Sequence, residues 1–169
     1  MANLDIALQK VLGWEGGFSN NPHDSGGVTF RGVTIGTYMQ YCKLKGKTPP
    51  SVEDLKKLDY RTIRDLADVL YWKKIKGDQI RNQSIANLCF DCIWGSGTVY
   101  IKKIQGVLGV SQDGIFGSMT LNAMNTWQPQ RDLFQRLWNR RKIYLEGCKG
   151  AVYYLKGWMR RLNSYTFEG

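Results

Sequence analysis

The sequence predicts a mainly α fold with one small β element that follows the first helix. Apolar residues recur at helical spacing over most of the chain. The exception is the stretch 18–36, which is rich in Gly, Asn, Ser and Pro and has alternating apolar residues at Val28, Phe30, Val33 and Ile35. This composition is typical of a loop with a short hairpin. A chain of 169 residues suits one compact domain with a closely packed smaller lobe.

The first half of the chain is predicted to hold three or four helices. The first covers the apolar positions from Leu4 to Leu12 and is expected to end around Glu15, because two glycines follow. Helical spacing returns near Tyr38. Ser51 and Asp54 then predict a capping box, which begins one or two helices that reach the aromatic pair at positions 71 and 72.

The second half continues the helical pattern. An apolar set from Ile85 to Ile93 predicts a buried helix that ends at Gly95-Ser96-Gly97, since glycine commonly stops a helix. Further helices are predicted from Val99 to Leu108, from Leu133 to Leu145 and from Val152 to Leu162. We expect these segments to pack on the first half rather than to form a separate body.

The charge of the chain indicates a polyanionic partner. Lys and Arg number 24 against 14 Asp and Glu, a net charge of +10, which attracts nucleic acid, anionic membrane or bacterial cell wall. The basic residues are spread along the chain, and the densest clusters, at 73–76 and 140–142, are short. A solvated basic surface is therefore favoured over a nucleic-acid site.

The N-terminus and the cysteines point to a protein made in the cytoplasm. The first residues alternate polar and apolar types, unlike a secretory signal, and no stretch is long enough to span a membrane, so no stable membrane insertion is expected. The four cysteines are expected to be free, mostly buried thiols. Cys89-x-x-Cys92 has no second pair, and His23 is the sole histidine, so neither a metal nor a cofactor nor a Ser-His-Asp triad is expected.

Glu15 is the candidate catalytic group. It follows the carbonyl end of the first helix and stands beside Trp14, and both neighbours would disfavour a negative charge on its carboxyl. A carboxylic acid kept protonated is what cleavage of a glycosidic bond needs from its general acid, a pattern known from lysozymes. On position alone, an ordinary exposed glutamate is the commoner interpretation.

Several blocks in order resemble glycoside hydrolase family 108, the muramidases. The first block is Glu15-Gly16-Gly17-Phe18-Ser19-Asn20, followed by Pro22, Asp24, Gly26-Gly27, Thr29 and Gly32-Val33-Thr34. Later blocks are Tyr71-Trp72, Phe90-Asp91, Gly95-Ser96-Gly97 and a segment from Ile101 to Met124, with Gln105, Asp113-Gly114 and Thr120, that is similar to the family's so-called peptidoglycan-binding region. The likeness covers at least residues 11–125. Two departures are His23, where the family often has an acidic residue, and Gly95, where it usually has Asn.

The resemblance implies a lysozyme-like α+β fold and an endolysin-type N-acetylmuramidase that cleaves the β-1,4 bond between N-acetylmuramic acid and N-acetylglucosamine. It carries the role of general acid onto Glu15. Asp24 and Thr29 stand as in phage lysozymes, where such residues hold the attacking water, although Asp24 also suits a turn. Asp91 is the rival second carboxylate, or a structural hydrogen-bonding aspartate.

The resemblance also suggests substrate contacts and a division of the chain. Tyr71, Trp72, Asp91 and Ser96 are candidate substrate-binding residues, with a place in the core as the alternative for the two aromatic ones. Residues 1–97 are expected to form the muramidase catalytic region, and residues 98–169 a C-terminal helical region resembling a peptidoglycan-binding domain, packed into one body.

The expected partner is bacterial peptidoglycan, with no nucleic acid, and the protein is expected to be a monomer that reaches the cell wall after release or by another export route. A lytic transglycosylase acting on the same bond, a non-catalytic wall-binding protein and a nucleic-acid-binding protein stay open as alternatives. Neither the stereochemistry nor the identity of the second catalytic group follows from the sequence.

Overall fold

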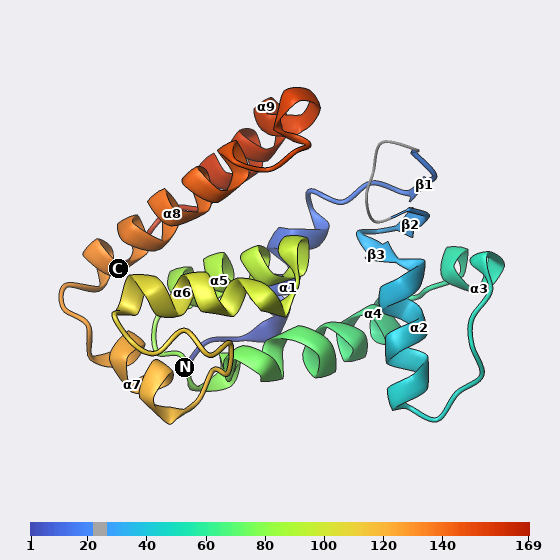
Figure 1. The fold of residues 1–169 in the computed structure, drawn as a ribbon. Helices are drawn as coiled ribbons and strands as arrows, with labels where there is room; N and C mark the ends of the chain where they lie inside the picture. The colour runs from blue at the N-terminus through green and yellow to red at the C-terminus, as the bar shows by residue number, and fades with distance from the viewer. Residues whose placement is uncertain (22–26) are drawn as a thin grey trace.

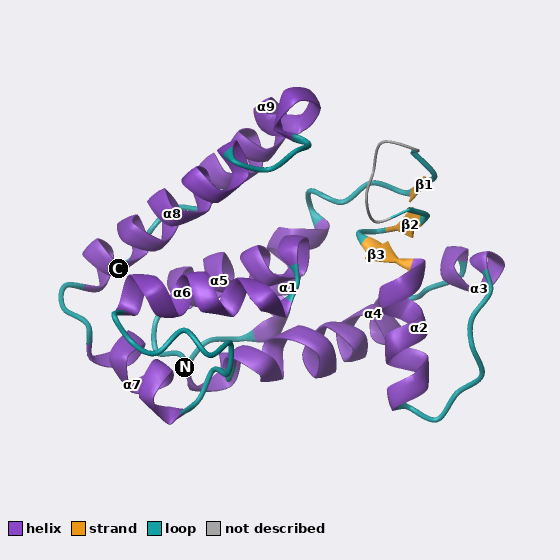
Figure 2. Ribbon diagram, viewed as in Figure 1, coloured by secondary structure: helices purple, strands orange, loops and turns teal. Residues whose placement is uncertain are grey.

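The computed structural model describes residues 1–21 and 27–169. Helices make up most of this described part, and the strands form one small sheet between the first two helices (Figure 2). The helices of the N-terminal half are α1 (Leu4–Leu12), α2 (Ile35–Leu44), α3 (Val52–Lys56), α4 (Tyr60–Ala67), the π-helical η1 (Asp68–Trp72) and the short 3₁₀ segments η2 (Lys73–Ile75) and η3 (Gly77–Gln79). Those that follow are α5 (Gln83–Ser96), η4 (Thr98–Tyr100), α6 (Ile101–Leu108), α7 (Ser118–Thr126), α8 (Gln130–Glu146) and α9 (Ala151–Asn163).

Helix α5 is the centre of the fold. Every residue from Ser84 to Trp94 is buried, so neighbours cover this helix on all sides. One of them is α1, whose buried positions Leu4, Ala7, Leu8 and Val11 follow the helical period. One cluster of buried residues runs from Ala2 to Tyr165. Residues 1–97 and 98–169 therefore share a core, while their assignment as catalytic and wall-binding regions stays a prediction.

The small sheet follows α1 and leads into α2. In the described part of the chain it has three antiparallel strands in the order β1 (Phe18–Ser19), β2 (Thr29–Phe30) and β3 (Val33–Thr34). Phe30 pairs with Val33 across a two-residue turn. Both turn residues, Arg31 and Gly32, have positive φ angles of 49° and 77°, as a primed hairpin turn requires. This tight turn places Gly32 beside the side chain of Glu15, which follows α1.

The last two long helices form an antiparallel hairpin along one side of the molecule. In Figure 1, α8 and α9 lie together, away from α2, α3 and α4, and the turn that joins them is on the side of the sheet. Trp138 in α8 donates from its indole nitrogen to the carbonyl of Leu162 in α9, at 3.1 Å. This contact and the buried side chains of Leu133, Leu137 and Leu162 hold the hairpin against the core.

The mainly α fold with a small β element after the first helix is confirmed. The capping box of Ser51 and Asp54 is present, and α5 ends before Gly97, whose φ is 78°. The first helix ends at Leu12 rather than around Glu15, and a turn continues it. Helix α7 was not predicted. Among the described residues no helix has both the length and the apolar character to cross a membrane.

Candidate active site

Glu15 lies in the turn that extends α1. The backbone N–H of Trp14 donates to Val11 and that of Glu15 to Leu12, at 3.0 and 3.2 Å, so the residue is placed by backbone bonds. Its carboxyl oxygen Oε1 accepts a hydrogen bond of 2.6 Å from Nη1 of Arg161 in α9. The two side chains are 19% and 20% exposed, which leaves the carboxyl accessible at the edge of the core.

Arg161 joins Glu15 to Asp91. Its Nε donates to Oδ1 of Asp91 at 2.7 Å, and the hydroxyl of Tyr165 donates to the same oxygen at 2.9 Å. Burial alone would lower the pKa of Arg161, but the carboxylates of Asp91 and Glu15 raise it overall. Burial is also the main cause of the raised pKa of Tyr165, followed by Asp91. We call Glu15, Arg161, Asp91 and Tyr165 the carboxylate cluster.

Gly32 supports the carboxyl from the other side. A Cβ atom at this position would lie 2.6 Å from Cδ, 2.7 Å from Cγ and 2.9 Å from Oε2 of Glu15. Only a residue without a side chain leaves room for the carboxyl there, and the positive φ also favours glycine. The hairpin turn and Arg161 thus hold the Glu15 side chain between them.

The surroundings of Glu15 differ from those expected. Trp14 is 40% exposed, so it does not seal the carboxyl from water. The group in direct contact is the guanidinium of Arg161, at 2.6 Å, whereas the expected neighbour was the ring of Trp14. The expectation missed Arg161 because this residue lies 146 positions away in the sequence.

The structure places the expected water-holding residues only in part. Asp24, like His23, lies outside the described residues. Thr29 lies on β2, opposite Ser19 on one side and Thr34 on the other. It is therefore on the hairpin whose turn contacts Glu15, and its role toward water stays a prediction.

The other carboxylate candidate, Asp91, is buried. Its side chain is 5% exposed, and Arg161 and Tyr165 both bind its Oδ1 atom. These contacts match the alternative of a structural, hydrogen-bonding aspartate. Asp91 can act on Glu15 through Arg161, without a direct contact to a sugar.

Tyr71 and Trp72 belong to an aromatic cluster that packs η1 on α5. Tyr71 and Trp94 have ring centroids 5.4 Å apart, and Trp72 and Phe90 are 5.7 Å apart. Trp72 is 1% exposed and donates to Asp78 at 2.7 Å, so its expected stacking on a sugar ring is not compatible with this packing. Tyr71 is half-buried, and burial raises its pKa; it keeps a partly exposed ring.

Ser96 is partly exposed, and its hydroxyl is bound by another side chain of the protein. Nη1 of the buried Arg141 donates to its hydroxyl at 2.7 Å, and the guanidinium lies over the ring of Tyr100. A Cβ atom at Gly95 would be 3.1 Å from Nη2 of Arg141. Arg141 therefore occupies the space beside the position where the resembling family usually has Asn.

The polar residues of the expected peptidoglycan-binding region bind one another. Nε2 of Gln105 donates to Asp113 at 2.8 Å and lies 3.2 Å from the hydroxyl of Thr120, while the N–H of Gly114 donates to Oε1 of Gln105 at 2.9 Å. Gln105 is 1% exposed. This network shapes the loop between α6 and α7, and wall binding by the region stays a prediction.

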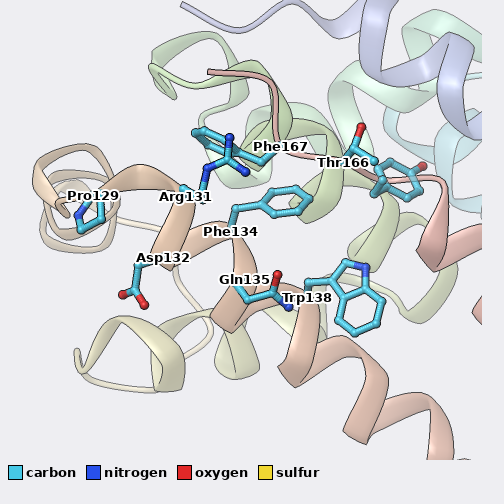
Figure 3. Close-up of a pocket in the computed structure, with 9 residues that line it drawn as sticks. Pro129, Arg131, Asp132, Phe134, Gln135, Trp138, Thr166 and Phe167 are labelled. Carbon is cyan, nitrogen blue, oxygen red and sulfur yellow. The ribbon is translucent and has the colours of Figure 1, made fainter.

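Two cavities are found in the described part of the chain, and the first is lined in part by Tyr165 of the carboxylate cluster. One of about 570 Å³ lies between α8 and the C-terminal segment, where Figure 3 shows Arg131 beside Phe167, with Phe134 and Trp138 nearby. A second, of about 450 Å³, lies beside Tyr41. Glu15 lines neither of these two cavities.

The cysteines are free thiols, with Cys42, Cys89 and Cys92 buried. Burial raises the pKa of Cys92 to about 12. Across residues 1–21 and 27–169, no group of three or more His, Cys, Asp or Glu side chains is arranged to hold a metal ion.

Comparison with known proteins gives the family of the chain and a solved structure with a similar fold. The family model described as Glycosyl hydrolase 108 matches residues 8–97, which is more than half of the chain and includes Glu15, Gly32 and Asp91. A solved structure titled "Structure of Brucella abortus SagA" is 28% identical, with a TM-score of 0.83 over 96% of this chain and 90% of that one. No curated protein matches. The chain belongs to glycosyl hydrolase family 108, and is thus a glycoside hydrolase.

Proposed function

We propose that the protein is an N-acetylmuramidase that cleaves the β-1,4 bond between N-acetylmuramic acid and N-acetylglucosamine in peptidoglycan, with Glu15 as the general acid. The observation that carries the proposal is the accessible Glu15 carboxyl, held by Arg161 on one side and Gly32 on the other. Family membership supports a peptidoglycan hydrolase in the broad sense. The acid and the bond are our inference.

The carboxylate cluster supports both protonation states that a general acid passes through. Glu15 has to be protonated before the glycosidic oxygen departs and is a carboxylate afterwards. When Glu15 is protonated, Arg161 still has Asp91 at 2.7 Å as a partner, so no buried cation is left unpaired. When the proton has moved to the sugar oxygen, Nη1 of Arg161 stabilises the new carboxylate. Asp91 and Arg161 are thus positioning residues.

The second half of the reaction decides between two outcomes. In hydrolysis, water attacks the sugar on the face opposite the acid, and we propose that Asp24 and Thr29 hold this water. In a lytic transglycosylase, the sugar's own hydroxyl closes an anhydro ring and no water enters. Among the described residues of the cluster, the other carboxylate is Asp91, which is buried and paired with Arg161. The cluster therefore offers no free carboxylate to activate a water molecule, and the transglycosylase stays open as the alternative.

The test is the substitution Glu15→Gln, which keeps the size of the side chain but removes the proton. Turnover of purified sacculi should fall by roughly 10² to 10⁴-fold, the usual worth of general acid catalysis, while sedimentation with sacculi persists. Glu146→Gln is the matched control, because Glu146 also has a cationic partner, Lys142 at 2.9 Å, but on the surface. Its turnover should equal that of the parent.

A Glu15→Gln protein that is folded and clears sacculi at the parent rate would refute the assignment. Mass spectrometry of the products distinguishes the two outcomes of the reaction. Reducing N-acetylmuramic acid ends indicate hydrolysis, and anhydro ends indicate the transglycosylase.

A further inference from the structure

Helix α9 carries two neighbouring rows of side chains. Leu155, Met159 and Leu162, at i, i+4 and i+7, pack on the hydrophobic core. The residues one position earlier, Tyr154, Trp158 and Arg161, have the same spacing and are turned by about 100° around the helix. They are partly buried, as are Leu155 and Met159, and Trp158 also packs against the core with part of its surface. We call this second row the α9 stripe.

The α9 stripe faces the catalytic side at both of its ends. At one end, Arg161 donates to Glu15 at 2.6 Å. At the other end, the hydroxyl of Tyr154 accepts a hydrogen bond of 3.2 Å from Nδ2 of Asn21, in the segment that follows β1. Figure 1 shows the corresponding arrangement, with the start of α9 on the side of the sheet. The row therefore runs from the partly buried side chain of Glu15 to the segment that follows β1.

The two rings form a continuous aromatic surface. Their centroids are 5.9 Å apart with an interplanar angle of 38°. Side chains on a helix lean toward its N-terminus, and the Trp158 ring accordingly lies over Gly150, where a Cβ atom would be 2.9 Å away. From Arg161 to Tyr154 the helix rises over seven residues, about 10 Å. The aromatic surface thus extends away from Glu15 along one direction.

We infer that the α9 stripe is a glycan-binding wall of the active site, where Trp158 and Tyr154 pack on sugar rings of the peptidoglycan strand next to the bond that Glu15 cleaves. The inference rests on the proposed function. We infer a glycan strand as the ligand because the stripe adjoins the carboxyl proposed to cleave the glycan: Arg161 belongs to both the stripe and the carboxylate cluster. Sugar rings have apolar faces and polar rims, which suit aromatic rings that each carry one polar group.

The test compares stripe variants with a neighbour on the same helix. Trp158→Ala and Tyr154→Ala should each raise KM for glycan strands freed of their stem peptides by roughly tenfold, with kcat nearly unchanged, because they remove binding that is equal in the ground and transition states. Val152→Ala is the control: Val152 is 86% exposed and lies two positions before Tyr154, turned by about 200° around the helix, so both constants should stay at parent values.

Two more variants separate stacking from scaffolding. Tyr154→Phe keeps the ring but loses the hydroxyl that binds Asn21, and its KM should equal that of the parent. Trp158→Leu keeps an apolar side chain for packing but has no ring. It should raise KM by roughly tenfold, which keeps the test usable if Trp158→Ala does not fold. A fall in kcat without a change in KM would overturn the inference, since it would mean that Trp158 only positions Arg161.

Binding to sacculi in the Glu15→Gln background provides a measure that needs no cleavage. Trp158→Leu should weaken this binding by roughly tenfold. If the parent cleaves glycan strands and the stripe variants keep parent KM and affinity, the inference fails and the proposed function stands. If the parent does not cleave but Trp158→Leu weakens binding, the proposed function fails and the binding wall stands.

Discussion

A single methyl group at Gly32 tests the placement of the carboxyl of Glu15, the proposed general acid. The φ of +77° costs a residue other than glycine about 1 to 2 kcal/mol. The added Cβ would lie 2.6 Å from Cδ of Glu15, and ordinary van der Waals contact begins at 3.4 Å, so the carboxyl carbon has to move by the difference, 0.8 Å. Displacement of about 1 Å in a catalytic group can cost roughly 10²-fold in rate. We expect Gly32→Ala to lose turnover of sacculi by that order.

Gly109→Ala separates backbone strain from displacement of the carboxyl. Gly109 ends α6 with a φ of +69°, and nothing lies within 4 Å of a Cβ there. Both variants should lose about 1 to 2 kcal/mol of unfolding free energy, measured by thermal melts, but Gly109→Ala should keep its turnover well below its melting temperature. Equal turnover in the two variants would refute the reasoning about Glu15.

Two further predictions concern the other carboxylates. Asp91→Asn should lower the free energy of unfolding by about 3 kcal/mol, measured by urea denaturation. This is the lower end of the range for a broken buried ion pair, because Arg161 still has Glu15 as a partner. Asp24→Asn should instead lower turnover without a loss of stability in urea. Parent stability with lost turnover in Asp91→Asn would instead pass the role of second carboxylate to Asp91. The hydrogen bonds from Arg64, at 2.6 and 3.0 Å, hold the pKa of Asp5 below its usual value. Its stabilising effect is therefore present above the unfolded-state pKa of about 3.9 and is lost as the pH falls through the folded-state pKa. Asp5→Asn should cost less than about 1 kcal/mol at neutral pH, because the pair is near half-exposed and screened, and thermal melts should show that this difference vanishes once the pH is below both pKa values.

The fold was predictable where local chemistry decides it. The Ser51 cap and the glycine that stops α5 act within a few residues of the helix they limit, so the sequence pattern is sufficient. Helix α7 is different, because its Ser, Thr and Asn residues have modest helix propensity and only Thr120 and Met124 are buried. Its position depends on Gln105, fifteen residues before Thr120, and such a tertiary contact has no local signature.

The candidate site was predictable only on its N-terminal side. The glutamate and the glycine-rich hairpin stand close together in the sequence, but Arg161 and Tyr165 come from the far end of the chain. A signal existed in the spacing of Tyr154, Trp158 and Arg161, since an arginine in line with aromatic residues on one helix face needs a partner for its charge. Trp72 and Ser96 fall in the family's blocks, yet Trp72 is buried in the core and the hydroxyl of Ser96 is bound by Arg141. A residue that belongs to a family motif can therefore serve packing rather than catalysis or substrate binding.

The carboxylate cluster joins the C-terminal end of the chain to the N-terminal half, because Arg161 in α9 and Tyr165 after it contact Asp91, and Arg161 contacts Glu15. The family model ends at residue 97, but a chain that ended there would lack Arg161, and Glu15 and Asp91 would lose the cation that they share. It would also expose the core positions that Leu133, Leu137 and Leu162 now cover. Because Glu15 and Asp91 share one arginine, Arg161 keeps an ionic partner when either of the two carboxyls is neutral. The side chain of Glu15, the proposed general acid, is thus held by a helix that lies outside the segment matched by the family model.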